Sequence, residues 1–422
     1  MRSMLKKIVP QIEFVEVGVN STKTLKMKKR CKKEDAAMVK KKTAKDPDFP
    51  KEEYADYRWK RAMELMRENN LDAIMITDHT NFHWFTGYDP GSHKMRPNIL
   101  VLPRLSDPAV FIYLKNAGKV LKHTWVENIN GYVDCPFRIE EFSDFMEQLG
   151  LSDASIGCEL SQDQRLGLPF LDFLKLGDSL LPKASFVDAG CLIWDLIMVK
   201  TPAELKRIRK ACQISDEAFL DWRETLHAGI MQKEAIASLK KFYLEKGATD
   251  RQRSGNVSID NKGWGDPMVD PFQNGDILWV DFGARYKGYV ADYSRRLSFG
   301  EPNELQKRHH ELIWKVLDAE IDAIKPGAKC SEVFTMMNEE MKRLGLPPMN
   351  PRKRAGHGIG LESIPPSINA FDQTVLKPNM VLTPEPRFES YYGRVHVEEM
   401  VVVTKDGCEV LTHAPRELYV IT

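Results

Sequence analysis

Residues 277–299 read ILWVDFGARYKGYVADYSRRLSF, which predicts two strands joined by a short turn. Counting outward from a turn centred on Tyr286 and Lys287 sets Asp281 directly opposite Asp292. Directly opposed side chains have Cβ atoms roughly 5 Å apart, and like charges at such positions destabilise the pair. We therefore expect a shared proton, an arginine or a metal cation to offset the repulsion between the two acids.

A second acidic hairpin is predicted in residues 379–404, NMVLTPEPRFESYYGRVHVEEMVVVT. Counting outward from Tyr391 and Tyr392 sets Glu385 opposite Glu398. Prolines flank Glu385 on both sides and prevent regular ladder bonding there, so we expect a break in the strand. Because two predicted helices precede each hairpin, the chain repeats one order of elements. Two such halves predict four carboxylates that converge near a pseudo-two-fold axis.

One histidine lies between the hairpins, in the glycine-rich stretch RAGHGIGLES of residues 354–363. Glycines let the backbone approach a bulky neighbour closely, and His357 alone fits a structural role at least as well as a chemical one. Joined to the four acids it completes an oxygen-rich set with one imidazole. Such a set suits two divalent cations of the Mn, Fe(II) or Co type better than a structural zinc ion, which prefers thiolates.

Composition and charge indicate a globular protein. The chain has 422 residues, 42% of them hydrophobic, and this length predicts two domains. The 61 basic and 60 acidic residues give a net charge of +1, so we expect no general attraction to nucleic acid or membrane. Seven cysteines without a CxxC spacing are typical of reduced thiols, and no apolar run approaches the roughly 20 residues of a membrane span. We therefore expect a cytoplasmic location.

Three segments are predicted along the chain. Residues 1–52 include a lysine-rich stretch with few large apolar side chains and are expected to form a mobile basic arm. Residues 53–190 alternate helical spacing with the short apolar strands LDAIMITD, ILVLP and PAVFIYL, as in an α/β domain. Residues 195–422 form the second domain, whose first helix is signalled by the N-cap Thr201 and the capping-box acid Glu204.

These motifs resemble the pita-bread metallopeptidases, which include methionine aminopeptidase, Xaa-Pro aminopeptidase and prolidase. The resemblance covers about residues 195 to 415. It is carried by the spacing of VDFG to ADYSR, by GHGIGLE, by TPEP followed by HVEE, and by VKTPAELKRIRKA. The preceding α/β segment is similar to the N-terminal domain shared by Xaa-Pro aminopeptidase, prolidase and creatinase. The resemblance implies an α+β fold with a C-terminal pita-bread domain after a smaller creatinase-type α/β domain.

In the family, the residues that match this chain bind two metal ions. By the resemblance, Asp281 holds one ion, His357 and Glu385 hold the other, and Asp292 and Glu398 bridge them. A water between the ions is the nucleophile, and the acid matching Glu385 handles its proton. The implied cations are Mn, Fe(II), Co or Zn, with Mn as the first expectation.

The chain also departs from the peptidase pattern at the accessory histidines. Trp264 falls where the first such histidine is expected, and Lys353 stands where another is common. A third is lost in the shortened segment ESIPPS. His396 replaces the arginine that normally precedes the bridging glutamate, and it could donate a proton or simply fill its strand position. We name Glu385 and His396 as candidate catalytic residues and Trp264 as a candidate substrate-binding residue.

The predicted function is a dinuclear metal-dependent hydrolase that resembles Xaa-Pro aminopeptidase or dipeptidase and acts on a small peptide. The missing histidines keep a second reading open, a non-peptidase relative similar to creatinase, ectoine hydrolase or dimethylsulfoniopropionate lyase that acts on a small zwitterion. A non-catalytic binding module is a third reading. It is disfavoured because such relatives generally lose the acids, and unpaired buried carboxylates are costly. The resemblance implies a homodimer.

Overall fold

The structure is a computed structural model that describes residues 51–91, 96–133, 137–161, 163–249, 256–259 and 271–422, with side chains except at 256–259. Nearly all of the predicted basic arm, residues 1–52, therefore lies outside the described residues, and so does Trp264. Among the described residues, none of the helices carries an apolar stretch long enough to cross a bilayer.

The N-terminal part contains one six-stranded sheet with the strand order β4-β3-β2-β1-β5-β6. Its strands are β1 (Ala73–Ile76), β2 (Ile99–Pro103), β3 (Ala109–Tyr113), β4 (Asn128–Tyr132), β5 (Ser155–Cys158) and β6 (Ser185–Asp188). The sheet is mixed, because β1 pairs parallel with β5 and antiparallel with β2. The three strands predicted from short apolar runs are confirmed as β1, β2 and β3.

Helices precede, connect and follow these strands. They are η1 (Glu53–Arg58), α3 (Trp59–Glu68), α4 (His79–Thr86), η2 (Leu114–Asn116), α5 (Ala117–His123), α6 (Ile139–Gln148), α7 (Phe170–Lys175), η3 (Leu176–Leu180) and α8 (Gly190–Met198). Phe111 of β3 anchors the core, with its ring 5.5 Å from that of Phe142 and 5.2 Å from that of Phe145, both on α6. Aromatic packing of this kind helps to hold α6 against the sheet.

The C-terminal part, from residue 199 onward, contains two larger sheets and two short hairpins. The first sheet has the order β19-β11-β8-β7 and the second has the order β13-β12-β14-β17-β18. Their strands are β7 (Asn256–Ile259), β8 (Ile277–Phe282), β11 (Tyr293–Phe299), β12 (Gly356–Ile359), β13 (Ser363–Ser367), β14 (Val381–Pro384), β17 (Val401–Val403), β18 (Cys408–Val410) and β19 (Tyr419–Ile421). The hairpins are β9 (Arg285–Tyr286) with β10 (Tyr289–Val290) and β15 (Arg387–Ser390) with β16 (Gly393–His396).

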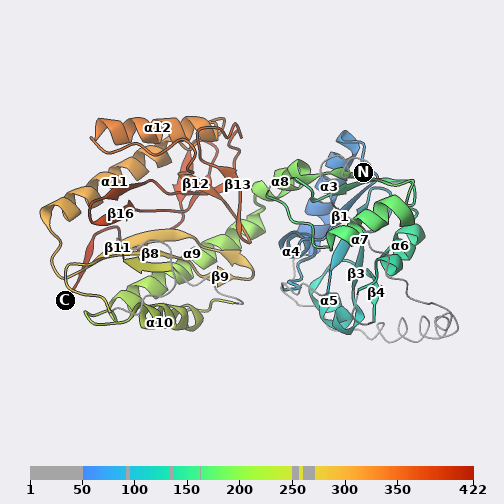
Figure 1. The fold of residues 1–422 in the computed structure, drawn as a ribbon, viewed down its shortest axis with the longest axis horizontal. Coiled ribbons are helices and arrows are strands. Elements are labelled where there is room, and N and C mark those ends of the chain that lie inside the picture. The colour runs from blue at the N-terminus through green and yellow to red at the C-terminus, as the bar shows by residue number, and fades with distance from the viewer. Residues whose placement is uncertain (1–50, 92–95, 134–136, 162, 250–255, 260–270) are drawn as a thin grey trace, which may run out of the picture. The chain divides into compact units, whose positions relative to one another are not determined.

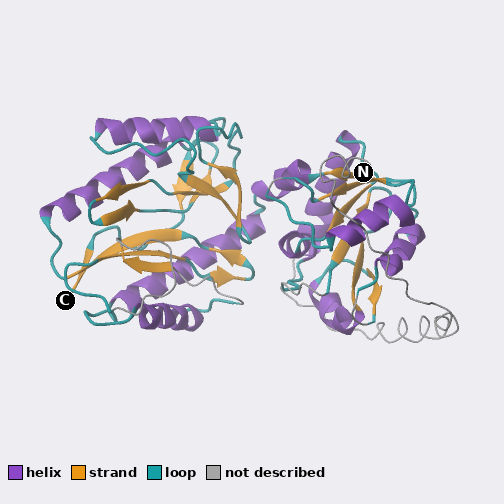
Figure 2. Ribbon diagram, in the orientation of Figure 1, coloured by secondary structure: helices purple, strands orange, loops and turns teal. Residues whose placement is uncertain are grey.

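Two pairs of helices enclose these sheets (Figures 1 and 2). They are α9 (Pro202–Arg223) with α10 (Gln232–Glu245), and α11 (Glu304–Ala323) with α12 (Cys330–Arg343). The predicted capping box begins α9, since Thr201 Oγ1 accepts from the Glu204 amide and Glu204 Oε2 accepts from the Thr201 amide. The expected order of two helices and then an acidic hairpin, twice along the chain, is confirmed.

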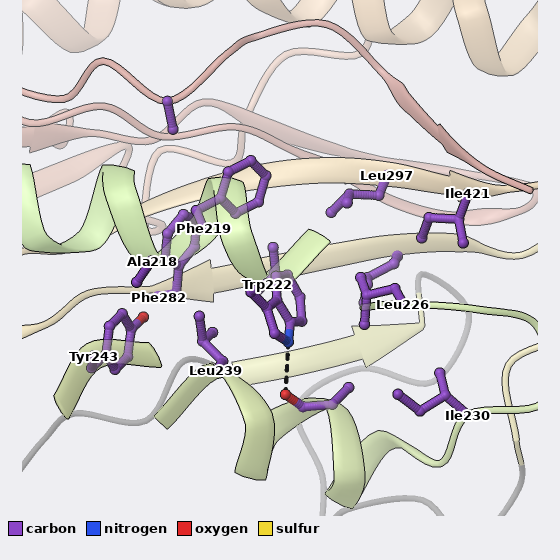
Figure 3. Packing of buried hydrophobic residues seen from close by; sticks show 14 of the residues in the cluster. Ala218, Phe219, Trp222, Leu226, Ile230, Leu239, Tyr243, Phe282, Leu297 and Ile421 are labelled. Carbon is purple, nitrogen blue, oxygen red and sulfur yellow. Dashed lines mark hydrogen bonds between the residues drawn. The ribbon is translucent and has the colours of Figure 1, made fainter. Parts of the chain in front are cut away.

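The core under the first sheet is built around Trp222 of α9 (Figure 3). Its indole is fully buried, and its Nε1–H donates to the carbonyl of Ala235 at 2.8 Å. Phe219, one turn earlier, stacks on Phe282 of β8 with ring centroids 5.1 Å apart. This packing holds α9 and α10 against the strand that carries Asp281.

The predicted register of the first hairpin is wrong. Tyr286 pairs with Tyr289, so the two residues at the turn are Lys287 and Gly288, both with positive φ (45° and 87°). Positive φ at both central positions gives the tight turn favoured in hairpins, and glycine adopts it readily. The pairing consequently shifts, and Asp281 lies opposite Ser294 instead of Asp292.

Candidate metal centre

The first hairpin places its two acids on one face of the sheet. Asp281 of β8 pairs with Ser294 of β11, and Asp292 precedes Ser294 by two positions. Because side chains alternate along a strand, Asp292 projects to the same side as Ser294 and Asp281. The two acids are thus diagonal neighbours, a relationship in which Cα atoms are roughly 7–8 Å apart.

An isolated bridge between Ser294 and Glu398 links the first hairpin to the second. The Ser294 amide donates to the Glu398 carbonyl at 3.2 Å, and Arg295 Nη1 donates to the same oxygen at 3.2 Å. Arg295 is itself held by the buried carboxylate of Glu399, with Nη2 to Oε2 at 3.1 Å. A buried ion pair therefore fixes the backbone that presents Glu398.

The second hairpin agrees with its predicted register. On one side of the break Leu382 pairs with Val401, and on the other side Arg387 pairs with His396. Both ladders have the register that sets Glu385 opposite Glu398. The predicted strand break also occurs, since β14 ends one residue before Glu385 and β15 begins two residues after it.

His357 joins this group through β12. It pairs with Thr383 of β14, two positions before Glu385, and both side chains are therefore expected on the same face. The next residue, Gly358, passes so close to β13 that an added Cβ would lie 2.3 Å from the carbonyl oxygen of Pro365. The bulky neighbour expected beside these glycines is thus the backbone of an adjacent strand.

The donor atoms of Asp292, His357 and Glu398 lie within 4.8 Å of one another, and all three residues are buried. His357 Nδ1 is 2.9 Å from the Gly358 carbonyl, which can only accept a hydrogen bond, so Nδ1 carries the proton. The lone pair of Nε2 remains available, 3.7 Å from Asp292 Oδ2. Burial lowers the pKa of His357, which favours the neutral, ligating form of the ring.

This donor set fits a divalent cation. Two carboxylates and one neutral imidazole nitrogen surround a small volume, and such ligands suit Mn, Fe, Co or Zn. Among the described side chains, Asp281 and Glu385 do not fall within this 4.8 Å group, although Asp281 is buried beside it. Three of the five residues proposed from the sequence are therefore brought together directly.

Glu385 instead contacts three basic side chains. Its Oε2 accepts from Arg387 Nη1 at 2.7 Å and lies 3.4 Å from His396 Nε2, while Oε1 is 3.4 Å from Arg354 Nε. Burial by itself raises the pKa of Glu385, but the close approach of His396 and the charge of Arg387 outweigh it and lower the pKa to about 2. Glu385 is therefore a carboxylate at neutral pH.

His396 is buried against Trp279 of β8, with ring centroids 4.9 Å apart. Among the described residues, neither of its ring nitrogens has a partner with hydrogen-bond geometry. Burial lowers the pKa of His396, and the charge of Glu385 opposes this effect. The ring is thus held beside the candidate site without a structural hydrogen bond.

Sequence reasoning missed three charged residues at this site. Arg354 and Arg387 flank His357 and Glu385 within the motifs themselves, and reading each motif for charge would have found them. Glu320 was detectable because it falls on the apolar face of the helix that contains Ile313. Burial raises its pKa well above the usual range, and the charge of Glu385 raises it further while Arg387 opposes the shift.

Comparison with known proteins identifies two family segments. Residues 206–405 match metallopeptidase family M24, and residues 58–199 match the creatinase/prolidase N-terminal domain. The Xaa-Pro dipeptidase of Pyrococcus horikoshii is 26% identical over 369 residues, which cover 85% of this chain and 97% of that protein. The ectoine hydrolase of Halomonas elongata is 24% identical over 403 residues, covering 88% of this chain and 98% of that protein.

A solved structure has a similar fold. The X-Pro aminopeptidase from Thermotoga maritima superposes with a TM-score of 0.75 at 23% identity, covering 86% of this chain and 99% of that one. The two family segments follow one another along the chain in the order expected for a creatinase-type N-terminal domain and a pita-bread domain. With its buried donor set of two acids and a histidine, this chain is a member of the pita-bread metallohydrolases of family M24.

Proposed function

We propose that this chain is a divalent-metal-dependent peptidase that hydrolyses Xaa-Pro bonds in small peptides. The observation that carries the proposal is the convergence of Asp292, His357 and Glu398, whose donor atoms lie within 4.8 Å of one another in a buried site. The choice of bond is supported by the Xaa-Pro dipeptidase that aligns with 85% of this chain.

The proposed site holds two cations. Asp281 would bind one cation, and His357 and Glu385 would bind the other. Asp292 and Glu398 would each bind both cations. Mn is the first choice of metal. Divalent cations supply the Lewis acidity that activates water and polarises a scissile carbonyl. This assignment is supported by the shared face of β8 and β11, which carries Asp281 and Asp292 next to the bridge to Glu398.

The protein's own part in the reaction is proton transfer. We assign Glu385 to accept the proton of the attacking water, since it is ionised and its Oε1 has no hydrogen-bond partner among the described residues. His396 is assigned to donate a proton to the leaving amine, because its Nε2 lies 3.4 Å from Glu385 Oε2. The pair could therefore pass one proton from water to the product.

A second candidate function is hydrolysis or elimination on a small zwitterion. It is favoured by the guanidinium groups of Arg354 and Arg387, which approach Glu385 and could bind a substrate carboxylate. Lys353 also stands where the peptidases commonly have a histidine. The ectoine hydrolase that covers 88% of this chain is consistent with this alternative.

A substrate panel separates the two functions. Purified protein loaded with Mn, Fe(II), Co or Zn in turn is assayed on Ala-Pro, a proline-containing tripeptide, creatine, ectoine and dimethylsulfoniopropionate. We expect metal-dependent cleavage of Ala-Pro that is lost in Glu398→Gln and kept in the exposed control Asp322→Asn. Turnover of a zwitterion alone would favour the second function. No turnover of any compound would favour the hypothesis that the protein is a non-catalytic binding module.

Further properties are proposed with the same function. Trp264 is proposed to line the substrate subsite, residues 53–190 and 195–422 to form separate domains, and residues 1–52 to form a basic arm. The protein is proposed to be a cytoplasmic homodimer, a state that analytical ultracentrifugation would measure. Limited proteolysis would test the domain boundaries, and the Ala-Pro KM of Trp264→Ala would test the subsite.

A further inference from the structure

A buried ionic network joins η1, near the start of the described chain, to α9 and β10. Arg58 of η1 and Glu204 of α9 are each 1% exposed, and Arg58 Nη2 lies 3.6 Å from Glu204 Oε2. The hydroxyl group of Tyr289 on β10 connects the two charges, since it accepts from Arg58 Nη2 at 3.2 Å and donates to Glu204 Oε1 at 3.0 Å. These three residues come from segments that are far apart in the chain, and we call them the Arg58 network.

Neighbouring groups give both charges of the Arg58 network further partners. Trp84 of α4 donates from Nε1 to Glu204 Oε1 at 2.8 Å, and the Trp84 carbonyl accepts from Arg58 Nη1. Glu53 Oε1 accepts from Arg58 Nη2 and, at 3.0 Å, from the hydroxyl group of Thr201. Buried charges are tolerated in proteins when they are paired and hydrogen-bonded in this way.

Such a network is not needed for stability alone. Taking a guanidinium and a carboxylate out of water is costly, and replacing a buried ion pair by apolar residues of similar volume is often neutral or stabilising. The best-attested use of buried polar groups is to select one arrangement of packed elements over others. The Arg58 network is therefore suited to fix where β10 lies relative to η1 and α9.

The strand held by this network leads directly to a candidate metal ligand. β10 ends at Val290, and Asp292 follows two residues later. Between them the Ala291 amide donates to the Ala284 carbonyl at 3.0 Å. An added Cβ at Gly283 would lie 1.7 Å from the Ala291 carbonyl oxygen, so the two backbone segments are in close contact. A packed backbone of this kind transmits a displacement of β10 to Asp292.

The same hairpin also contacts the segment that follows His357. The Val290 amide donates to the carbonyl of Gly360, three residues after His357, at 3.0 Å. Arg285 of β9 donates from Nη1 to the carbonyl of the next residue in that segment at 2.8 Å. The β9–β10 hairpin is thereby bonded to the chain close to two of the three residues whose donor atoms converge, Asp292 and His357.

We propose that Tyr289 is a positioning residue for the metal centre, through which Arg58 and Glu204 set the place of Asp292. This inference rests on the proposed function, in which Asp292 is a metal ligand. Tyr289 acts through the backbone, because its hydroxyl group holds the strand that presents the ligand. Metal–ligand distances have to lie within about 0.2 Å of their usual values, so a small shift of this strand weakens binding.

Tyr289→Phe tests the proposal with little disturbance, because it removes one hydroxyl group and leaves Glu204 bonded to Trp84. Isothermal titration calorimetry measures the Mn(II) dissociation constant of the full-length protein well below its melting temperature. We expect Tyr289→Phe to raise this constant by about 2- to 30-fold, the range for residues that act on a site through intervening contacts. The matched control is Tyr286→Phe, at the residue paired with Tyr289 in the same hairpin, and it should leave the constant unchanged.

A second measurement needs no metal. In chelator, hydrogen–deuterium exchange of residues 289–292 should be faster in Tyr289→Phe than in wild type, because the strand has lost one of its attachments. Arg58→Gln should also weaken Mn(II) binding. Combining it with Tyr289→Phe should add little further loss, since both substitutions break the same network. A role in stability alone would lower the melting temperature in chelator and leave the Mn(II) dissociation constant of the folded protein unchanged.

The outcomes are distinguishable from failure of the proposed function. If wild-type protein binds Mn(II) and Tyr289→Phe binds it equally well, the positioning role is refuted while the metal site stands. Additive losses in Tyr289→Phe and Arg58→Gln would also refute it, because the two residues would then act independently. If Arg58→Gln does not fold, Tyr289→Phe and its control decide. If wild-type protein binds no divalent cation, the proposed function fails first and the positioning role falls with it.

Discussion

Asp292→Asn should separate charge repulsion from metal binding at the candidate site. A carboxylate oxygen of Asp292 lies within 4.8 Å of one of Glu398, and both residues are 2% exposed. At an effective dielectric constant of about 20, two unit charges at this separation repel by about 3.5 kcal/mol. His357 offsets little of this at pH 7.5, because burial lowers its pKa and the ring stays neutral.

The metal-free variant is therefore expected to be more stable than the metal-free wild type. Asn keeps the volume of Asp but loses hydrogen bonds that the carboxylate accepts, so we expect a net gain of about 1–3 kcal/mol, below the full repulsion. With Mn(II) at 1,000 times its dissociation constant, wild type should gain about 4.1 kcal/mol by mass action, and the variant should gain almost none. The variant should therefore be the more stable protein without metal, and wild type should be the more stable protein once metal is added.

The assay is differential scanning calorimetry of both proteins, first with chelator and then with Mn(II), supported by elemental analysis. One kcal/mol corresponds to about 2–4 °C for a domain of 150–250 residues, so the shifts are measurable. Asp322→Asn, an exposed acid on α11, is the control for the substitution itself. A chelated variant that melts at or below wild type would refute the repulsion, and an equal Mn(II) gain in both proteins would refute the metal site.

Three further predictions concern activity, pH and packing. His396→Ala should lower kcat for Ala-Pro by about 10²- to 10⁴-fold, as expected for loss of a proton donor. The control His413→Ala, at an exposed histidine, should leave kcat unchanged. Equal kcat in wild type and His396→Ala would exclude His396 from proton transfer. Burial lowers the pKa of Lys200 to about 8 from 10.5, so the unfolded chain binds more protons between these pH values and stability should rise with pH there by about 3 kcal/mol. Chemical denaturation should show this rise in wild type and not in Lys200→Met. Trp222→Ala should cost about 3–5 kcal/mol in denaturant titration, against little change for the 62% exposed Leu244→Ala, and a small loss would contradict the packing in Figure 3.

The candidate site was predictable from sequence to the extent that it depends on residue types and local spacing. The acids in both hairpins and His357 stand in short motifs, and period-two alternation assigns each acid to one face of its strand. The register of the second hairpin was also predicted correctly, and the observed strand pairings on both sides of the break confirm it. The first register was not, because it depends on whether Lys287 adopts a positive φ, and a shift of one turn position moves Asp281 from Asp292 to Ser294.

The amino-acid sequence by itself determined which chemical groups the protein offers, namely four acids and one histidine on or beside two sets of strands with one pair of helices between them. Tertiary structure decided which of them meet. Asp292, His357 and Glu398 lie far apart in the chain, and contacts between the two hairpins, among them the bridge at Ser294 and the packing of His396 on Trp279, bring them together. Contacts between distant segments depend on packing that no local pattern encodes. For the same reason the proximity of Glu320 to the site appears only in the folded chain.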